Sequence, residues 1–144
     1  TASGRLGIKS GKGIYNYSNE EKEDPFLENA VKETQKETGI SNTEFSVHRL
    51  LLPMINEAVI SFHEGVSTLS DIDIAMLAGT GFPQEKGGPL HYADSQGLDS
   101  LLKELEKFNL QFGQRFWPAP LFKRYVAAGW LGVKAKKGFF DYFE

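Results

Sequence analysis

Residues 129–142 read GWLGVKAKKGFFDY, and residues 4–17 read GRLGIKSGKGIYNY. Aligned without a gap at an offset of 125 positions, the two stretches share seven of fourteen residues, where chance predicts about one. The identical pairs are Gly4/Gly129, Leu6/Leu131, Gly7/Gly132, Lys9/Lys134, Lys12/Lys137, Gly13/Gly138 and Tyr17/Tyr142. Copies of one closing motif a domain length apart predict that one structural unit ends near residue 17 and that another fills the rest of the chain. The alternative is two independent hairpins that match by chance.

We call residues 4–17 the first closing loop and residues 129–142 the second closing loop. We expect the first closing loop to be the end of a preceding copy, to keep its hairpin shape, and to pack on this domain or on another chain. Residues 18–24, SNEEKED, are mostly charged and predict a solvated boundary. The expected organisation is therefore an end of a preceding copy (1–17), a connector with one helix (18–43) and a domain (44–144).

The connector helix is predicted to begin at Pro25, with Asp24 as its N-cap, and to end at Gly39. Its apolar residues form one stripe, which consists of Phe26, Leu27, Ala30 and Val31. We expect this stripe to pack against the main body.

Residues 44–65 carry the strongest helical period and predict the central helix. The apolar positions, at steps of three and four, are Phe45, Val47, Leu50, Leu51, Met54, Ile55, Ala58, Val59 and Phe62. Pro53 lies inside this helix and should kink it. Asn56 and Glu57 follow one turn later, where they either fasten a neighbouring loop or face solvent. We favour fastening.

A short helix is predicted over residues 71–78, with Ser70 and Asp73 as its capping box. Residues 79–89, GTGFPQEKGGP, are so rich in glycine and proline that they predict an ordered turn or a binding loop. Further helices are expected from Pro89 to Asp94, over 98–108 and over 121–128. The loop and its surroundings supply the candidate ligand contacts, which are Lys86, Gly87, Gly88 and His91.

Composition limits the classes of function. The chain has 144 residues, 40% of them hydrophobic, which is enough to bury a core. A net charge of −3 argues against nucleic acid as the main partner, and the longest apolar runs are too short to span a bilayer. The absence of cysteine suits an intracellular protein. We expect the cytoplasm first, with the peroxisome and the mitochondrion left open.

The pattern predicts neither a metal site nor a catalytic residue. The three histidines, His48, His63 and His91, are not placed at a metal-ligand spacing such as i, i+4. No cysteine can act as a nucleophile, and no Gly-x-Ser-x-Gly motif occurs. The candidate site residues would therefore either have structural roles or contact a substrate.

Several motifs in a specific order resemble the C-terminal domain of 3-hydroxyacyl-CoA dehydrogenases over residues 44–142. The motifs are RLLLP (49–53), NEA (56–58), EG (64–65), DID (71–73), GFP (81–83), GGP (87–89) and KGFFDY (137–142). The resemblance implies an all-α fold, related to the C-terminal domain of 6-phosphogluconate dehydrogenase, with short extended closing motifs. Two tandem copies resemble the tail of the multifunctional enzymes of fatty-acid β-oxidation, in which a hydratase and an NAD-binding domain come first.

By this resemblance the parent enzyme oxidises an L-3-hydroxyacyl-CoA with NAD. Its partners would be a Rossmann domain and a sister copy, with acyl-CoA bound in the parent. The family's catalytic residues belong to that Rossmann domain, so this chain should bind no cofactor and be inactive alone. In active copies an Asn precedes the Arg-Leu-Leu motif, and this position is His48 here. We therefore expect a structural, dimerisation-like domain.

Two alternatives stay open. A CoA- or acyl-CoA-binding module would use the glycine loop and the lysines of the closing loops. A free-standing oligomerisation domain, such as a homodimer, would use the apolar edge of the connector helix.

Overall fold

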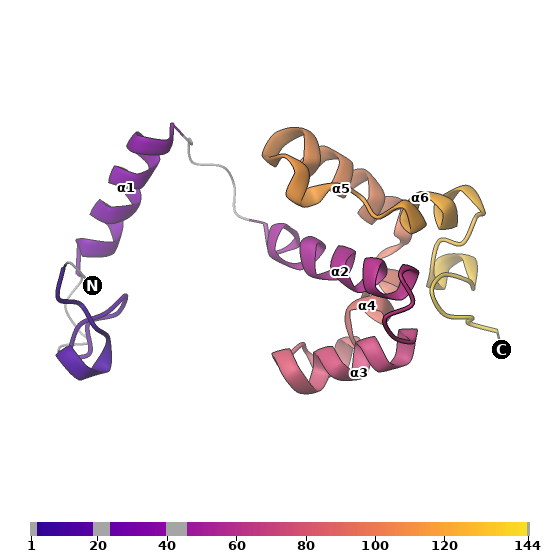
Figure 1. The fold of residues 1–144 in the computed structure, drawn as a ribbon, viewed down its shortest axis with the longest axis horizontal. Helices are drawn as coiled ribbons and strands as arrows, with labels where there is room; N and C mark the ends of the chain where they lie inside the picture. Colours follow the sequence, from indigo (N-terminus) through magenta and orange to yellow (C-terminus); the bar gives the residue numbers. More distant parts are fainter. Residues whose placement is uncertain (1–2, 19–23, 40–45, 144) are drawn as a thin grey trace. The chain divides into compact units, whose positions relative to one another are not determined.

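The computed structural model describes residues 3–18, 24–39 and 46–143. These ranges form α-helices and short 3₁₀-helices (η), and their only β-pairing is through isolated bridges, so the prediction of an all-α fold is confirmed (Figure 1). The chain divides into two compact units, Thr1–Glu44 and Phe45–Glu144. None of the helices in the described ranges is long and apolar enough to cross a membrane.

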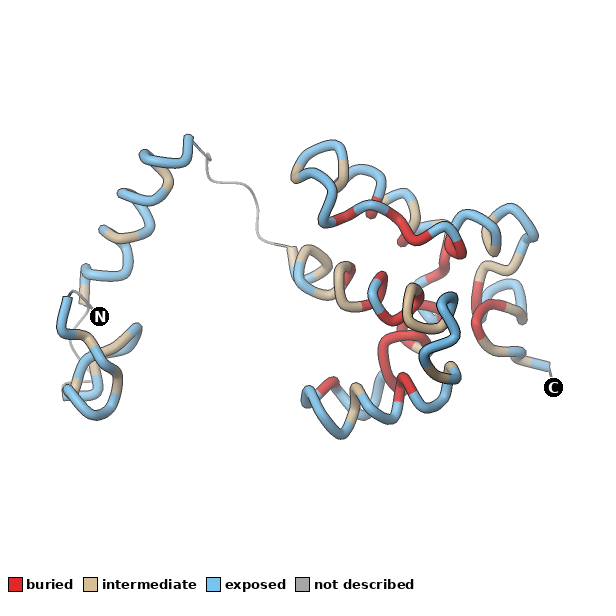
Figure 2. Tube along the Cα trace, in the orientation of Figure 1, coloured by how far each residue is buried: buried red, intermediate tan, exposed pale blue. Residues whose placement is uncertain are grey.

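The first unit holds the first closing loop and α1 (Phe26–Thr38). The helix begins one residue later than predicted, because Pro25 and not Asp24 occupies the N-cap position, although the Asp24 Oδ1 still accepts a hydrogen bond from the Phe26 amide at 3.1 Å. The Arg5 guanidinium links loop and helix through an ion pair of 2.7 Å with Asp24. None of the described residues before position 40 is buried (Figure 2). Packing of the α1 stripe against the main body stays a prediction.

The central helix of the second unit is α2 (His48–His63), with Pro53 inside it. One side is fully covered, since Leu52 and Ile55 are 0% exposed. Val47 and Leu50 were predicted to share the apolar stripe, but both are exposed. The prediction was wrong because Val47 precedes the helix, whereas Leu50 and Leu52, two positions apart, lie about 200° apart around it. Phe45, predicted in the same stripe, lies outside the described residues.

The helix α3 (Leu69–Thr80) begins two residues earlier than predicted. Its cap is Thr68, whose Oγ1 accepts from the Asp71 amide at 3.2 Å and donates to the Asp71 carboxylate at 2.7 Å. The predicted capping box of Ser70 and Asp73 is therefore wrong. Asp73 is 2% exposed and turns toward a different helix.

The remaining helices follow closely on one another. They are η2 (Gln84–Lys86), α4 (Pro89–Gln96), α5 (Leu98–Phe112), η3 (Gln114–Phe116), α6 (Pro120–Ala127) and η4 (Val133–Ala135). The central helix α2 contacts α3, α4, α5 and α6, and buried positions cluster where these helices meet (Figures 1 and 2). The largest fully buried apolar side chains are Phe122, Leu52, Ile55, Leu90, Leu98, Leu101, Leu105 and Val59.

The two closing loops share one backbone conformation. Each contains a 3₁₀-helix, η1 (Ile8–Ser10) or η4, and each ends that helix on a left-handed residue, Gly11 at φ 68° or Lys136 at φ 57°. Equivalent positions form the antiparallel bridges, which are Gly7↔Lys12 and Lys12↔Asn16 in the first loop and Gly132↔Lys137 and Lys137↔Asp141 in the second. The prediction that the first closing loop keeps its hairpin shape is confirmed.

Candidate functional site

The second closing loop is fastened to helix α4 by the carboxylate of Asp94. The amides of Phe139 and Phe140 donate to Oδ1 and Oδ2 at 3.0 and 2.9 Å, and the Tyr142 hydroxyl donates to Oδ2 at 3.0 Å. A Cβ at Gly138 would collide with this carboxylate, so glycine is required for the close approach. Asp94 is 1% exposed. All three donors come from one loop, so this carboxylate joins two segments of the fold.

Burial controls the protonation of this cluster. It raises the pKa of the Asp94 carboxyl, and the hydrogen bonds from the loop only partly offset this rise. Burial and the neighbouring Asp94 charge also raise the pKa of Tyr142, so its hydroxyl keeps its proton and remains a donor. Sequence reasoning missed Asp94 because it lies 45 positions from Phe139 and no local pattern connects them.

A second buried carboxylate, Asp73 of α3, caps the N-terminus of α4. Its Oδ1 accepts from the Leu90 amide at 2.8 Å, and its Oδ2 accepts from the His91 amide at 3.1 Å and lies 2.7 Å from His91 Nδ1. The N-cap position itself is Gly88, which has no side chain to offer. Asp73 therefore supplies from another helix the acceptor that an N-cap side chain normally provides.

The glycine loop makes this capping contact sterically feasible. Gly88 has φ 110°, and a Cβ there would collide with Asp73. Gly87 has φ 73°, and its Cβ would lie 3.1 Å from His91. The His91 ring stacks on Phe140 with centroids 3.7 Å apart, which connects the loop to the second closing loop. Of the two alternatives from the sequence, these contacts favour an ordered turn, while ligand contact by His91 stays a prediction.

His48 lies between helices α4 and α5. Its Nδ1 is 2.6 Å from Glu104 Oε2, and its Nε2 is 3.3 Å from the Tyr92 hydroxyl. An ionised carboxylate can only accept, so we assign the proton on Nδ1 to the bond with Glu104. Lys86 reaches the same aromatic ring, with Nζ 4.8 Å from the Tyr92 centroid. His48 and Lys86 therefore contact one tyrosine, and both contacts hold helices together.

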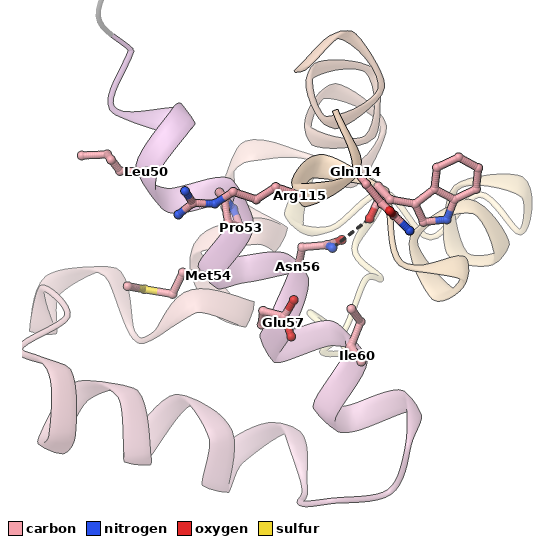
Figure 3. A pocket seen from close by; sticks show the side chains of 9 residues that line it. Leu50, Pro53, Met54, Asn56, Glu57, Ile60, Gln114 and Arg115 are labelled. Atoms are coloured by element: carbon pink, nitrogen blue, oxygen red, sulfur yellow. Dashed lines mark hydrogen bonds between the residues drawn. The ribbon is translucent and has the colours of Figure 1, made fainter. Parts of the chain in front are cut away.

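Asn56 fastens α2 to the segment before α6, as predicted. Its Nδ2 donates to the Trp117 carbonyl at 3.0 Å (Figure 3). Its Oδ1 accepts from the Ala119 amide at 2.8 Å. The same prediction was wrong for Glu57, which is exposed and lines an open groove of about 550 Å³ between α2 and η3. Other groove residues are Leu50, Met54, Ile60, Arg115 and Trp117.

The predicted site residues therefore lie in three places. Gly87, Gly88 and His91 meet at the start of α4, His48 and Lys86 meet at Tyr92, and Asn56 and Glu57 lie on the groove side of α2. Within the described ranges no group of three His, Cys, Asp or Glu side chains could hold a metal ion. The contacts that these residues make join helices and loops of the domain.

Known proteins share this domain. The family model described as "3-hydroxyacyl-CoA dehydrogenase, C-terminal domain" matches residues 45–142. A 3-hydroxybutyryl-CoA dehydrogenase of Bradyrhizobium diazoefficiens is 44% identical over 99 residues, which cover 68% of this chain and 33% of that protein. A fatty acid oxidation complex subunit alpha of Idiomarina loihiensis is 36% identical over 128 residues, which cover 88% of this chain and 18% of that protein.

The fold agrees with this relationship. The crystal structure of (S)-3-hydroxybutyryl-CoA dehydrogenase PaaH1 from Ralstonia eutropha matches with a TM-score of 0.65 and 35% identity, over 83% of this chain and 44% of that chain. The chain thus spans less than half the length of the proteins named here. The resemblance stated from the sequence motifs is confirmed, and the chain belongs to the family of the 3-hydroxyacyl-CoA dehydrogenase C-terminal domain.

Proposed function

We propose that this chain is the helical C-terminal region of a longer, NAD-dependent L-3-hydroxyacyl-CoA dehydrogenase of fatty-acid β-oxidation. In this role it supports the catalytic domain and is inactive alone. The observation that carries the proposal is the family match over residues 45–142, combined with the small share of each relative that the chain covers. We place the parent enzyme inside the cell, with NAD and acyl-CoA bound chiefly by a preceding Rossmann domain.

The residues described do not fit a dinucleotide. A dinucleotide site of the Rossmann type needs a parallel strand, a glycine-rich turn and a free helix N-terminus to face the pyrophosphate. The glycine turn here leads into α4, but the Asp73 carboxylate already accepts the amide hydrogen bonds at that helix end. We therefore derive no hydride-transfer step for this chain.

The hydrogen bonds from the Leu90 and His91 amides to Asp73 also argue against a CoA-binding module at the glycine loop. A phosphate would have to displace Asp73 and would meet its negative charge. Two of the three lysines of the second closing loop are also engaged, because Lys134 pairs with Asp99 and Lys137 lies 3.6 Å from Asp141. These two ion pairs partly neutralise the positive charge that a phosphate would meet on this loop.

The contacts of His48 support the proposal that this chain is inactive alone. By the family resemblance, active copies carry an asparagine at this position, which helps the substrate site. Here the histidine is held between Glu104 and Tyr92, at 2.6 and 3.3 Å, so its ring nitrogens face other helices of the domain. We propose that this copy exchanged a substrate contact for a link between helices α2, α4 and α5.

The match to the Idiomarina subunit favours a multifunctional parent. It covers 88% of this chain, whereas the second unit alone makes up residues 45–144, so the similarity extends upstream of that unit. A sister C-terminal copy would then be the packing partner of this domain. The isolated chain would form a homodimer only if the surface that contacts the sister copy can also contact the same surface on a second molecule.

The first experiment is an assay of the 144-residue chain with NAD and 3-hydroxybutyryl-CoA, followed by NADH absorbance. The Bradyrhizobium relative serves as the positive control under the same conditions. We expect no turnover above buffer. Turnover that is lost in the His48→Ala variant would contradict the proposal. Sedimentation at high concentration tests self-association separately.

The second experiment asks whether the domain can support catalysis. Residues 46–143 replace the corresponding region of the Bradyrhizobium relative, with His48 or with His48→Asn. We expect both chimeras to fold, because the sequences are 44% identical, and the His48→Asn chimera to turn over substrate faster. Equal rates in two folded chimeras would contradict the proposal that His48 replaces a residue that contacts the substrate in active copies.

A further inference from the structure

Lys136 has an unusual backbone conformation. At φ 57° it is the only residue other than glycine with a left-handed backbone in the described ranges. The equivalent residue of the first closing loop, 125 positions earlier, is Gly11 at φ 68°. A side chain in this conformation crowds the backbone, whereas glycine adopts it without that cost. The second closing loop thus keeps a lysine in a turn that glycine forms in the other loop, which points to a role for the lysine side chain.

Lys136 also changes the course of the chain after the turn. In the first closing loop, the Ser18 amide and hydroxyl both donate to the Gly11 carbonyl at 3.1 Å, and a Cβ at Gly11 would collide with that hydroxyl. Phe143 is the equivalent of Ser18, and in the described part of the second closing loop its amide makes no such bond to Lys136. The side chain of Lys136 is therefore incompatible with the closed arrangement that Ser18 forms over Gly11.

An open hollow of about 600 Å³ lies at this point of the second closing loop. It is lined by Val133, Lys136, Asp141, Tyr142 and Phe143. Phe143 is 73% exposed and Val133 is 46% exposed, so two apolar walls of the hollow face water. The Tyr142 amide donates to the Lys136 carbonyl and its hydroxyl donates to Asp94, both at 3.0 Å. The wall that Tyr142 forms is therefore held in place from two sides.

The ammonium group of Lys136 is the positive charge that this hollow offers to a ligand. The other two lysines of the loop are engaged, because Lys134 pairs with Asp99 and Lys137 lies 3.6 Å from Asp141. Within the described residues, Lys136 forms no ion pair. The hollow therefore combines one available cation with apolar walls.

We propose that this hollow binds a small carboxylate with an apolar body, such as an aryl-substituted short-chain acid. The carboxylate pairs with the Lys136 ammonium, and the apolar body lies against Phe143 and Val133. The ion pair and the burial of apolar surface act together, which neither a neutral apolar compound nor a bare carboxylate can achieve. A doubly charged phosphate is disfavoured, because the Asp141 carboxylate lines the same hollow.

The test is a titration of the ¹⁵N-labelled 144-residue chain with 3-phenylpropionate, followed by NMR. We expect the amide signals of Val133, Lys136 and Phe143 to shift and to saturate with a Kd of about 1–5 mM, the range for a ligand of this size. The neutral 3-phenylpropionamide tests the charge, acetate tests the apolar body, and inorganic phosphate tests the selectivity for a single charge. Each should bind at least about 3-fold more weakly than 3-phenylpropionate, as fits the loss of one exposed contact.

The Lys136→Gly variant separates binding from folding, because it recreates the turn of the first closing loop. We expect it to bind 3-phenylpropionate at least about 3-fold more weakly than the native chain. Its midpoint of urea unfolding should equal or exceed that of the native chain, since the left-handed turn no longer carries a side chain. Lys136→Arg keeps the charge and should bind as the native chain does. Lys107→Gln, which removes an exposed lysine of α5, is the matched control and should leave binding unchanged.

Four outcomes would overturn the proposal. The first is the absence of a saturable shift at the hollow, and the second is equal binding of 3-phenylpropionate and one of the three comparison ligands. The third is a Lys136→Gly variant that binds as tightly as the native chain. The fourth is a Lys136→Gly variant whose urea midpoint falls, because the lysine would then serve the fold and not a ligand.

Discussion

The Tyr142 hydroxyl lies 3.0 Å from Oδ2 of Asp94, which precedes it by 48 positions. Two main-chain amides of the same loop donate to this carboxylate as well. Charge-assisted hydrogen bonds are stronger than neutral ones, and an acceptor that is almost fully buried cannot exchange them for bonds to water. A single carboxylate of α4 therefore accepts three of the hydrogen bonds that hold the second closing loop in place.

We expect Asp94→Asn to lower the free energy of unfolding by about 2–3 kcal/mol, since one carboxylate oxygen becomes an NH₂ group that faces an amide donor. Urea unfolding followed by circular dichroism measures this loss. The matched control is Asp141→Asn in the same loop, where an exposed ion pair with Lys137 at 3.6 Å should contribute less than about 0.5 kcal/mol. Equal losses in the two variants would show that Asp94 does not have this role.

The pH dependence of stability gives a second prediction for Asp94. Burial raises its pKa, so the folded chain binds this proton more tightly than the unfolded chain does. The contribution of Asp94 to the free energy of unfolding should therefore fall as the pH rises from the unfolded value of about 3.9 through the raised value, and then stay constant. Urea unfolding of the native chain and of Asp94→Asn across this range isolates the effect, because the other carboxyls cancel. The advantage of the native chain should grow as the pH falls.

Asp99 provides a control of opposite sign. The Lys134 ammonium lowers the pKa of Asp99, so its stabilising contribution is present above the ordinary aspartate pKa and is lost as the pH falls below about 4. The difference between the native chain and Asp99→Asn should therefore shrink on acidification. The two quantities compared are the differences in free energy of unfolding between the native chain and each Asp→Asn variant. If both change in the same direction as the pH falls, the pKa of Asp94 is not raised in the folded chain.

Gly88 provides a third prediction, which concerns backbone conformation. Gly88→Ala places a Cβ against Asp73 at φ 110°, so it should lower the free energy of unfolding by more than about 2 kcal/mol. Gly79→Ala is the matched control, because Gly79 lies inside α3 with nothing within 4 Å of its Cβ. Alanine there should raise the free energy of unfolding by about 0.5–1 kcal/mol. Thermal unfolding of the two variants should therefore shift in opposite directions.

The sequence was informative where a pattern is local or repeated. The apolar period predicted α5, Gly39 predicted the end of α1, and the internal repeat predicted the shape of the first closing loop. Each of these features is encoded within a few residues or in a direct copy. The domain's identity followed from the order of its motifs.

The remaining features depend on contacts between distant residues. Thr68 with Asp71 and Ser70 with Asp73 fit the same capping pattern, and only the burial of Asp73 beneath α4 separates them. The role of Asp94 has no local signature in the sequence. Its hydrogen-bond partners belong to the second closing loop, and helices α5 and α6 separate this loop from Asp94 along the chain. Long-range polar contacts of this kind are specified by packing, which a single sequence does not display.

Asn56 provides the last prediction, because both ends of its side-chain amide are used. It is 3% exposed, donates to the Trp117 carbonyl and accepts from the Ala119 amide. Asn56→Ala leaves both main-chain groups unpaired and should lower the free energy of unfolding by about 2–3 kcal/mol.

Asn56→Asp has nearly the same shape as the native residue but places a carboxylate oxygen against the Trp117 carbonyl. It should therefore lower the free energy of unfolding by at least about 1 kcal/mol more than Asn56→Ala at neutral pH, because the buried charge also loses its hydration. Glu57→Gln, one position further and on the open groove, should change it by less than about 0.5 kcal/mol. Urea unfolding of the three variants decides the matter. An Asn56→Asp variant as stable as Asn56→Ala would mean that the direction of the hydrogen bond to Trp117 is not what holds α2 to this segment.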